Sequence, residues 1–358
     1  MRILYLLNHK TLTDFEVPIL IKNGHEVYMS KNFKSLSVQN SINYTTSGFY
    51  SNFLPTHVTT LKLLDQIDFY SASRELTKIE LDIINSHFDC IFLTCLISKK
   101  LLIQLSNNFH GDIYFRFFGL SNEESYKNLL FSLYPNCNFS RFKYLFSYQE
   151  IIDFEFSRKD NLNFFNNNNS FFIPLGLSNS FVTNYLDTYR PIKTQMCFVN
   201  SRIDDGPHSY YRNIYINFLK NFSGMPFVIL GKNNTSVQDK PYIKNNLNDS
   251  DFYGEFQNSL FMYYHSKEER HLHYHPLEAA IIGLPVLFYS QSLLASIFPE
   301  SPGVCYSDQE MMNKCQLILS NSNEGSSFIN SIITYQNQNI NKLFIGNNLN
   351  IFNIITNE

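Results

Sequence analysis

A helix start of the kind that can bind anions and diols is predicted at residues 275–278, which read His-Pro-Leu-Glu. Pro276 fits a first helical turn, where its missing N–H has no partner to lose, and Gly283 marks the helix end. Glu278 would then lie in the first turn, where its carboxylate can accept two hydrogen bonds from a ribose diol. The free N–H groups and the dipole of the same helix end attract a phosphate. The alternative is that Glu278 is one of the acids that commonly occupy first turns.

Two basic residues follow strands that are predicted to end at the same edge of a sheet. Arg202 comes after the predicted strand 195–200, and Lys232 comes after Gly231, which ends the predicted strand 226–230. A guanidinium or ammonium group at either position can neutralise a leaving diphosphate. The alternative for each is an ordinary solvated surface charge.

Four histidines lie close together in the sequence just before this helix. His271, His273 and His275 alternate, so they would share one face of an extended segment. Such spacing can ligate a metal, but neither an Asp-x-Asp pair nor a cysteine accompanies it, and we expect no metal site. The other roles open to them are phosphate contacts and structural roles. His265, at the end of the predicted strand 260–264, is expected to contact a donor, with a plain surface histidine as the alternative.

The first half of the chain offers candidates for a general base and for an acceptor site. His9, Asp14 and Glu16 follow the first predicted strand, and each has a side chain that can take a proton from a hydroxyl. The alternative for the acids is a helix start, with Thr13 or Asp14 as the N-cap. Arg116 ends another predicted strand and can bind an anionic acceptor, or it can form a salt bridge to a carboxylate of its own domain.

Strands and helices alternate along both halves, which predicts parallel α/β sheets. In the first half, strands are predicted at 2–7, 25–29, 89–94, 112–117, 144–147 and 170–173, with helices at 14–23, 99–105 and 122–133. In the second half, strands are predicted at 195–200, 226–230, 260–264 and 285–289, with helices at 210–221, 276–282 and 310–320. The polar segment 179–193 is predicted to be the interdomain linker. Two doubly wound domains would bind ligands in a cleft at the carboxyl ends of their strands.

Composition agrees with a folded two-domain protein. The chain has 358 residues, and domains usually have about 100–200 residues. With 34 Phe and 23 Tyr it has too many aromatic residues for a disordered chain. A formal net charge of -3 gives no reason to expect a nucleic-acid partner. There is no apolar run of roughly 18 residues and no secretory leader, and six scattered cysteines form no CxxC pair. We therefore expect a cytosolic protein with reduced thiols.

Residues 275–287 resemble the C-terminal signature of the GT-B glycosyltransferases. The resemblance is closest to the large retaining family with the element E-A-x-x-x-G-x-P-V, which here begins at Glu278. Residues 171–177, 198–202 and 228–232 match other parts of the family in order and spacing. The family usually has a second Glu eight positions before the first, where this chain has Arg270, with Glu268 and Glu269 nearby. Its Gly-rich loop after the first strand is replaced here by residues 8–16.

The resemblance implies a GT-B fold, with two Rossmann-like doubly wound domains that face a central cleft. The implied domains are an acceptor-binding domain at 1–182, a nucleotide-sugar-binding domain at 183–340 and a C-terminal helix at 341–358 that packs back on the first domain. The implied donor contacts are Glu278, His275, Pro276, Arg202, Lys232, His265 and Gly231. The catalytic candidates remain those named from the residues themselves, Asp14, Glu16 and His9, with Arg116 on the acceptor side.

The implied activity is transfer of a sugar from a nucleotide-activated donor to a hydroxyl of a glycan or a lipid-linked glycan. No cofactor and no metal are expected. By analogy the role would be in bacterial surface polysaccharide synthesis, such as lipopolysaccharide O-antigen or capsule, in the cytoplasm and with peripheral contact to the inner membrane. Three alternatives share the architecture. They are a transferase for a CMP-activated acidic sugar of the Kdo kind, a sugar-nucleotide 2-epimerase, and a non-catalytic module that binds a glycan or nucleotide.

Overall fold

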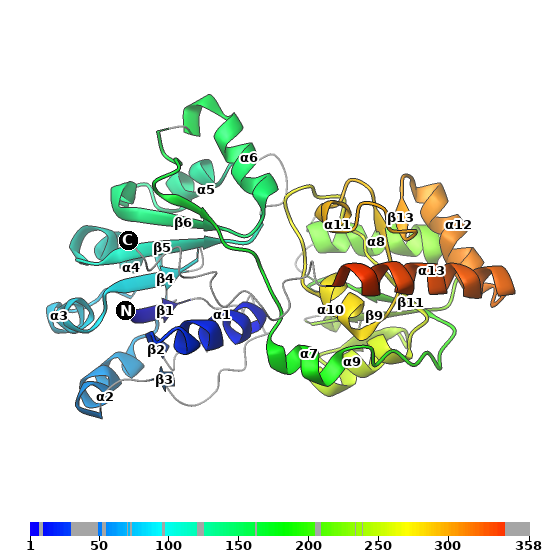
Figure 1. Ribbon diagram of the computed structural model, residues 1–358, viewed down its shortest axis with the longest axis horizontal. Helices are drawn as coiled ribbons and strands as arrows, with labels where there is room; N and C mark the ends of the chain where they lie inside the picture. Colours follow the sequence, from blue (N-terminus) through cyan, green and yellow to red (C-terminus); the bar gives the residue numbers. More distant parts are fainter. Residues whose placement is uncertain are drawn as a thin grey trace. The chain divides into compact units, whose positions relative to one another are not determined.

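The computed structural model describes two units, each built on one sheet (Figure 1). It describes residues 1–6, 10–29, 49–51, 55–69, 71, 74–94, 97–119, 125–161, 163–204, 209–232, 234–237 and 239–340. The first unit contains Met1–Ser178, and the second begins at Asn179. The division between the units lies four residues before the predicted boundary at 182. The predicted C-terminal helix at 341–358 lies outside the described residues.

The first unit is a seven-stranded sheet with the order β3-β2-β1-β4-β5-β6-β7. Its strands are β1 Arg2–Leu6, β2 Glu26–Met29, β3 Phe49–Ser51, β4 Cys90–Leu93, β5 Asp112–Phe117, β6 Phe142–Phe146 and β7 Ser170–Phe172. Among these strands only the pair of β2 and β3 is antiparallel, as its register shows. The predicted parallel α/β sheet is therefore confirmed for this half of the chain.

Helices connect the strands of the first unit. They are α1 Lys10–Lys22, α2 Pro55–Leu61, α3 Lys78–His87, α4 Lys99–Asn108, α5 Tyr126–Leu133 and α6 Gln149–Ser157. The prediction that Thr13 or Asp14 caps the first helix is wrong, because α1 begins at Lys10 and both residues lie inside it. Gly24 ends the turn after α1 with φ 82°, a conformation that favours glycine.

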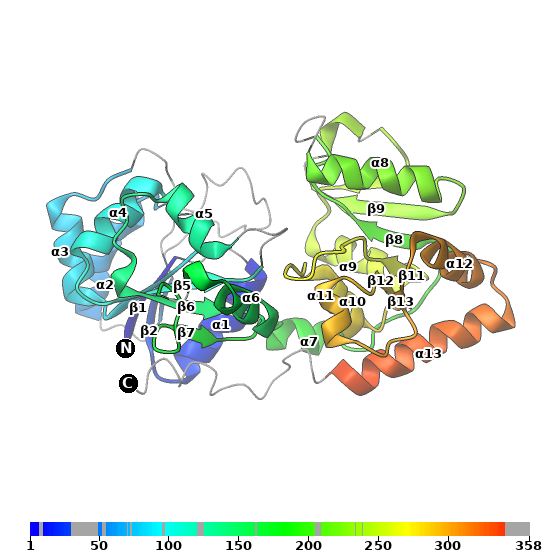
Figure 2. The same cartoon turned by 90° about the horizontal axis from the view of Figure 1, so that it is seen from above.

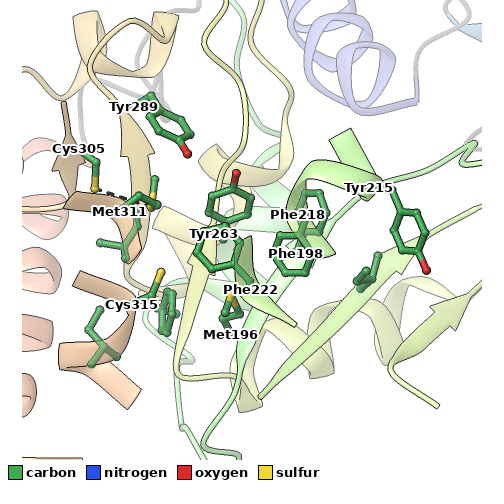
Figure 3. Close-up of a cluster of buried hydrophobic side chains, with 14 of the residues drawn as sticks. Met196, Phe198, Tyr215, Phe218, Phe222, Tyr263, Tyr289, Cys305, Met311 and Cys315 are labelled. Atoms are coloured by element: carbon green, nitrogen blue, oxygen red, sulfur yellow. Dashed lines mark hydrogen bonds between the residues drawn. The ribbon is translucent and has the colours of Figure 1, made fainter. Parts of the chain in front are cut away.

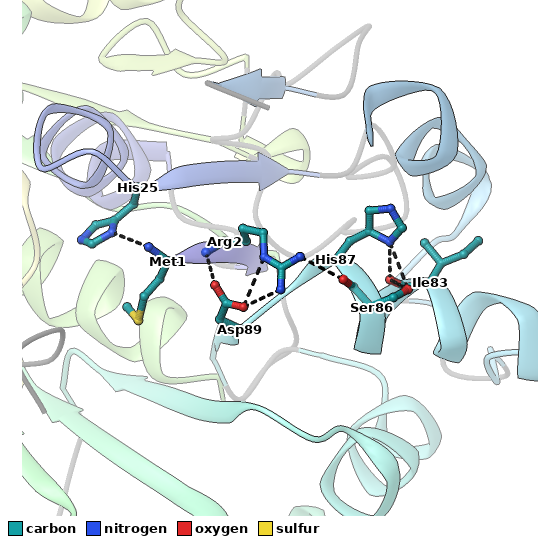
Figure 4. Close-up of polar contacts among 7 residues, drawn as sticks. All are labelled: Met1, Arg2, His25, Ile83, Ser86, His87 and Asp89. Atoms are coloured by element: carbon teal, nitrogen blue, oxygen red, sulfur yellow. Dashed lines mark hydrogen bonds and ion pairs between the residues drawn. The ribbon is translucent and has the colours of Figure 1, made fainter. Parts of the chain in front are cut away.

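A polar network occupies the amino-terminal edge of the first sheet (Figure 4). The Asp89 carboxylate accepts hydrogen bonds from the backbone N–H of Arg2 at 2.7 Å and from its guanidinium at 2.6 Å. The amino terminus lies 3.2 Å from Nδ1 of His25. Burial alone would raise the pKa of Asp89, but the hydrogen bonds and charge of Arg2 outweigh it and lower that pKa. Since these groups lie away from the carboxyl ends of the strands, we assign them a structural role.

The second unit is a six-stranded sheet with the order β10-β9-β8-β11-β12-β13, and its described pairs are parallel. Its strands are β8 Met196–Val199, β9 Phe227–Gly231, β10 Ile243–Asn245, β11 Phe261–Tyr263, β12 Val286–Tyr289 and β13 Val304–Cys305. Its helices are α7 Asn179–Tyr185, α8 Tyr210–Phe222, α9 Asp249–Asn258, α10 His275–Ile282, α11 Leu293–Ile297, α12 Asp308–Leu319 and α13 Asn323–Asn339. The neighbours α12 and α13 lie side by side in both views (Figure 2).

The core of the second unit is aromatic and joins α8 to the middle of the sheet (Figure 3). Phe198 of β8 stacks on Phe218 of α8 with ring centroids 4.4 Å apart. Phe218 and Phe222 in turn contact Tyr263 of β11, at centroid distances of 5.4 and 5.0 Å. Aromatic pairs of this kind add about 0.5–1.5 kcal/mol each beyond the area they bury. The packing therefore fixes the C-terminal half of α8 against β8 and β11.

The segment predicted as a linker attaches to the end of α10. It begins with α7 and continues as irregular chain. The backbone N–H groups of Asp187 and Tyr189 donate to the carbonyls of Ile281 and Ile282 at 3.0 and 2.8 Å. These bonds satisfy carbonyl groups that the last turn of α10 would leave without partners. Gly283 follows with φ 90°, which confirms the predicted helix stop.

Candidate functional site

The candidate donor site lies within the second unit, at the carboxyl edge formed by the neighbouring strands β9, β8 and β11. Two loops meet there because a buried asparagine joins them. Asn234 is fully buried, and its Nδ2 donates to the carbonyl of Asn200 at 2.9 Å while its Oδ1 accepts from the N–H of Ile203 at 2.8 Å. Gly231 is required at the end of β9, since a Cβ there would lie 2.1 Å from the carbonyl oxygen of Asn200.

The two basic residues predicted for this edge lie on these joined loops. The N–H of Arg202 donates to the carbonyl of Lys232 at 2.9 Å, and the N–H of Lys232 donates to Oγ of Ser201 at 3.1 Å. Arg202 has φ 60°, an uncommon conformation for a residue with a side chain, and its guanidinium lies 4.5 Å from the ring centroid of Tyr211. The backbone around Arg202 is thus strained and fixed, which is frequent at ligand sites.

Helix α10 begins at the same edge, one loop after β11. Its first residue is His275, Pro276 follows within the first two positions, and Glu278 lies in the first turn. Glu278 is only 6% exposed, and Tyr253 of α9 reaches it. Burial, reinforced by the charge of Glu278 and the hydrogen bond to it, raises the pKa of Tyr253 well above its ordinary value. The first turn of α10 therefore carries one buried, oriented carboxylate, while the N–H groups of Leu277 and Glu278 donate to the carbonyl of Tyr274 at 2.9 and 3.0 Å.

The four histidines at 265, 271, 273 and 275, which we call the histidine cluster, lie with tilted rings around His273 at the start of α10. The ring centroids of His271 and His273 are 4.5 Å apart, those of His273 and His275 are 5.1 Å apart, and those of His265 and His273 are 5.4 Å apart. The alternation in the sequence predicted one shared face for the last three, and these distances agree. Arg202 is close enough to His273 to disfavour its protonation.

Burial decides the charge of the cluster in the free protein. It lowers the pKa of His265 to about 4, although the Glu268 carboxylate acts in the opposite direction. Burial, followed by the charges of neighbouring histidines, also lowers the pKa values of His273 and His275 well below the ordinary value. These three imidazoles are therefore neutral near neutral pH.

Glu268 orients one end of the cluster. Its Oε2 lies 2.7 Å from Nδ1 of His271. Burial alone would raise the pKa of Glu268, but the hydrogen bond and charge of His271, together with the Tyr210 hydroxyl, outweigh it and lower that pKa. Glu268 is thus an ionised carboxylate beside the cluster. Within the described residues, no group of three or more His, Cys, Asp or Glu side chains is arranged to hold a metal ion.

In the first unit, the structure joins two predicted site residues in a buried ion pair. Nε of Arg116 donates to Oε1 of Glu16 at 2.8 Å, and neither side chain is exposed. The Tyr5 hydroxyl donates to Oε2 of Glu16 at 2.9 Å, and Arg116 also donates to the carbonyls of Leu145 and Pro174 at 3.3 and 3.2 Å. Burial raises the pKa of Glu16, while Arg116 acts to lower it.

This pair corresponds to the salt bridge that was the alternative role for Arg116. A carboxylate held by Tyr5 and Arg116 away from solvent reaches no acceptor hydroxyl without breaking the pair, so we do not retain Glu16 as a base. Asp14 lies one turn into α1, is partly buried and is not without an interaction partner. His9, the third candidate, lies outside the described residues.

We call the carboxyl edge of β9, β8 and β11, together with the start of α10, the donor edge. Several of its residues were not predicted from the sequence. Tyr253 lies on α9, a helix that was not predicted, because its segment contains Gly254 and few strong helix formers. Asn234 lies in an asparagine-rich stretch in which no single asparagine stands out. Tyr210 and Tyr211 were assigned only to a helix, and the proximity of Tyr210 to Glu268 depends on the tertiary fold.

No protein-family model and no curated protein matches the chain. Solved structures match it in fold. A glycosyltransferase from Rickettsia africae has 12% identity and a TM-score of 0.55, with 100% of this chain and 99% of that chain covered. Anabaena HepE in complex with UDP has 12% identity and a TM-score of 0.54, with 100% of each chain covered. A mutant of the T4 phage BGT in complex with UDP-glucose has 13% identity and a TM-score of 0.53, with 96% and 95% covered. The chain thus shares with these proteins the predicted α/β fold of the GT-B class, built from two Rossmann-like units.

Proposed function

We propose that this chain is a glycosyltransferase, which transfers a sugar from a nucleotide-activated donor to a hydroxyl group of a glycan or a lipid-linked glycan. The observation that carries the proposal is the start of α10, where the buried Glu278 lies in the same turn as His275, a member of the histidine cluster that Arg202 also faces. The fold adds support, because the Anabaena and T4 phage proteins that share it are described in complex with UDP or UDP-glucose.

In this proposal the second unit holds the donor. Glu278 accepts hydrogen bonds from the ribose hydroxyls, and the positive end of the α10 dipole, at His275 and Pro276, attracts the phosphates. Arg202 and Lys232 lie on loops locked together at the same edge, and they add positive charge for the leaving phosphate. Gly231 lets the two loops approach closely enough to do this.

The proposed reaction requires little covalent chemistry from the protein itself. The leaving phosphate must be stabilised, the cation-like sugar must be shielded from water, and the acceptor oxygen must be aimed at the reacting carbon. We assign the acceptor side to the first unit, with Asp14 or His9 as the general base if the reaction inverts the anomeric centre. The Arg116–Glu16 pair would then support the strands that carry this side, as positioning residues. A role in bacterial surface polysaccharide synthesis, at the inner face of the membrane, completes the proposal. Of the helices that the structure describes, none is long and apolar enough to cross a bilayer.

The proposal is tested by mixing the protein with UDP-, GDP- and CMP-sugars and measuring nucleotide release with and without glycan acceptors. Acceptor-dependent release supports a transferase, and the nucleotide that is released distinguishes a diphosphate donor from a CMP-activated acidic sugar. Interconversion of the sugar without an acceptor would support an epimerase instead. Binding without turnover would support the non-catalytic module. Duplex DNA is included as a negative control, because the net charge of -3 leads us to expect no transfer to it.

Metal independence is part of the same proposal. The start of α10 and the basic side chains can hold a diphosphate without a divalent ion. The T4 phage BGT has also been described in complex with UDP and Mn2+. Whether turnover needs a metal ion therefore has to be measured for this chain. Turnover is expected to persist in EDTA. Complete loss of turnover in EDTA, with recovery in Mn2+, would contradict this and point to the histidines as ligands.

A further inference from the structure

The histidine cluster contains buried nitrogen atoms without partners. His265 is 9% exposed, and neither Nδ1 nor Nε2 has a hydrogen-bond partner among the described residues. Nδ1 of His273 lies 3.2 Å from the Tyr264 hydroxyl, but its Nε2 is also without a partner in that part of the chain. Buried polar atoms are normally paired, so unpaired ones mark a place where a ligand or an ion is expected.

The groups around the cluster leave it poor in hydrogen-bond acceptors. Among the described residues, those that face it are Arg202 from the loop after β8, Tyr210 from the start of α8, and Tyr264 and Glu268 from the segment after β11. Glu268 is the one carboxylate in this set, and it is engaged by His271 at 2.7 Å. An arriving anion would therefore meet imidazole nitrogens and a guanidinium. The negative charge of Glu268 lies at the end of the cluster that His271 forms.

We propose that the histidine cluster is a proton-coupled receptor for the phosphate groups of the nucleotide sugar, in which binding of the phosphates brings protons from solvent onto His265 and His273. The inference rests on the proposed function and extends it. In this step an O–H bond of the solvent breaks and an N–H bond of the imidazole forms, and no other bond changes. A neutral imidazole takes one proton from the solvent and becomes an imidazolium, which donates to a phosphate oxygen. The proton returns to solvent when the nucleotide leaves.

The free protein cannot hold these charges unaided. Burial, the neighbouring imidazoles and Arg202 all disfavour a positive charge on His273. A phosphate placed against the rings reverses the balance, because an opposite charge at close range favours the protonated form. The pKa of His265 is about 4 in the free protein and would rise on binding. Binding then takes up protons at any pH between the pKa of the free protein and the higher pKa of the complex. The affinity for the donor must therefore increase as the pH falls through this range.

The test is calorimetry of donor binding in buffers of different ionisation enthalpy, near neutral pH. The probes are UDP-glucose, GDP-mannose and uncharged uridine. Both phosphates of a nucleotide sugar are diesters and lack the second ionisation of a monoester, at about pH 6, so the protons counted belong to the protein. The variants are His265→Asn and His273→Asn, with His110→Asn as the matched control. His110 is exposed and precedes β5, so it lies at the amino-terminal edge of the first sheet, away from the carboxyl ends of the strands.

The wild type and His110→Asn are expected to take up about one proton for each of His265 and His273 that the bound phosphates protonate, so about two at most. Their affinity should weaken as the pH rises, by up to about tenfold per pH unit for each proton. Each cluster variant should lose the share of this uptake that belongs to the replaced histidine, while melting at nearly the wild-type temperature. Two separate variants guard against one that fails to fold. Binding without proton uptake by the wild type, or undiminished uptake by both variants, overturns the inference and leaves the proposed function standing. Failure of every nucleotide sugar to bind overturns both.

Discussion

At the scale of single residues, Glu278 carries the most specific part of the donor site. We expect Glu278→Gln to weaken binding of the nucleotide sugar by about 10–100-fold, because a hydrogen bond to a charged group contributes about 1.5–3 kcal/mol. The melting temperature should change little, since a Gln oxygen can still accept from Tyr253. The measurement is calorimetry of donor binding together with a thermal melt.

Glu324→Gln is the matched control for that variant, because Glu324 is an exposed acid in the first turn of α13 in the same unit. It should leave donor affinity unchanged. Equal affinities for the wild type and Glu278→Gln would mean that Glu278 is only a first-turn acid, as the sequence also allowed. A large loss of stability would instead show that its main role is the contact with Tyr253.

At the scale of elements, the donor edge depends on how closely the loops after β8 and β9 approach. We expect Gly231→Ala to destabilise the protein, since the added Cβ would meet the backbone carbonyl of Asn200 at 2.1 Å. Overpacking typically costs about 1–3 kcal/mol, and each kcal/mol lowers the melting temperature by about 2–4 °C in a domain of this size. Gly224→Ala is the control, because nothing lies within 4 Å of a Cβ there. Equal melting temperatures for the two variants would contradict the close approach.

The elements show where sequence patterns are informative. Buried strands are short apolar runs, and β5 at Asp112–Phe117 has the predicted bounds. The first helix was predicted to begin four residues late, because Lys10 offers no capping signal while Thr13 and Asp14 do. The long helix α13, Asn323–Asn339, was not predicted, since serines and asparagines favour caps and turns over helix interiors.

Part of the donor edge could be predicted from the sequence, because some of its residues occupy positions that local patterns mark. Glu278, Arg202 and the histidines lie next to strand ends or a helix start, and such positions can be inferred from local patterns. The contacts of Tyr253 with Glu278 and of Arg116 with Glu16 join elements that are distant in the sequence. Residue 116 is separated from residue 16 by 100 positions, and no local pattern encodes that pairing.

At the scale of the whole molecule, the proposal divides the work between the two units. The second unit has its own donor edge, so a change in the first unit should alter turnover without altering donor affinity. Asp14 lies one turn into α1, the helix that follows β1, and acceptor chemistry is proposed at the carboxyl end of that strand. A general base typically contributes about 10²–10⁴-fold to the rate. Asp14→Asn should therefore cut turnover by that order if the product is inverted, and much less if it is retained.

Glu16→Gln on the same helix provides the contrast. It removes the charge that faces the buried guanidinium of Arg116, and breaking a buried pair in this way costs about 3–5 kcal/mol. Its main effect should thus be a lower melting temperature, with donor affinity preserved in the molecules that remain folded. The measurements are turnover, donor affinity, thermal melts and the anomeric configuration of the product by NMR. Full turnover of Asp14→Asn with an inverted product would remove Asp14 from the active site, and the base would then have to be His9 or another residue of the first unit.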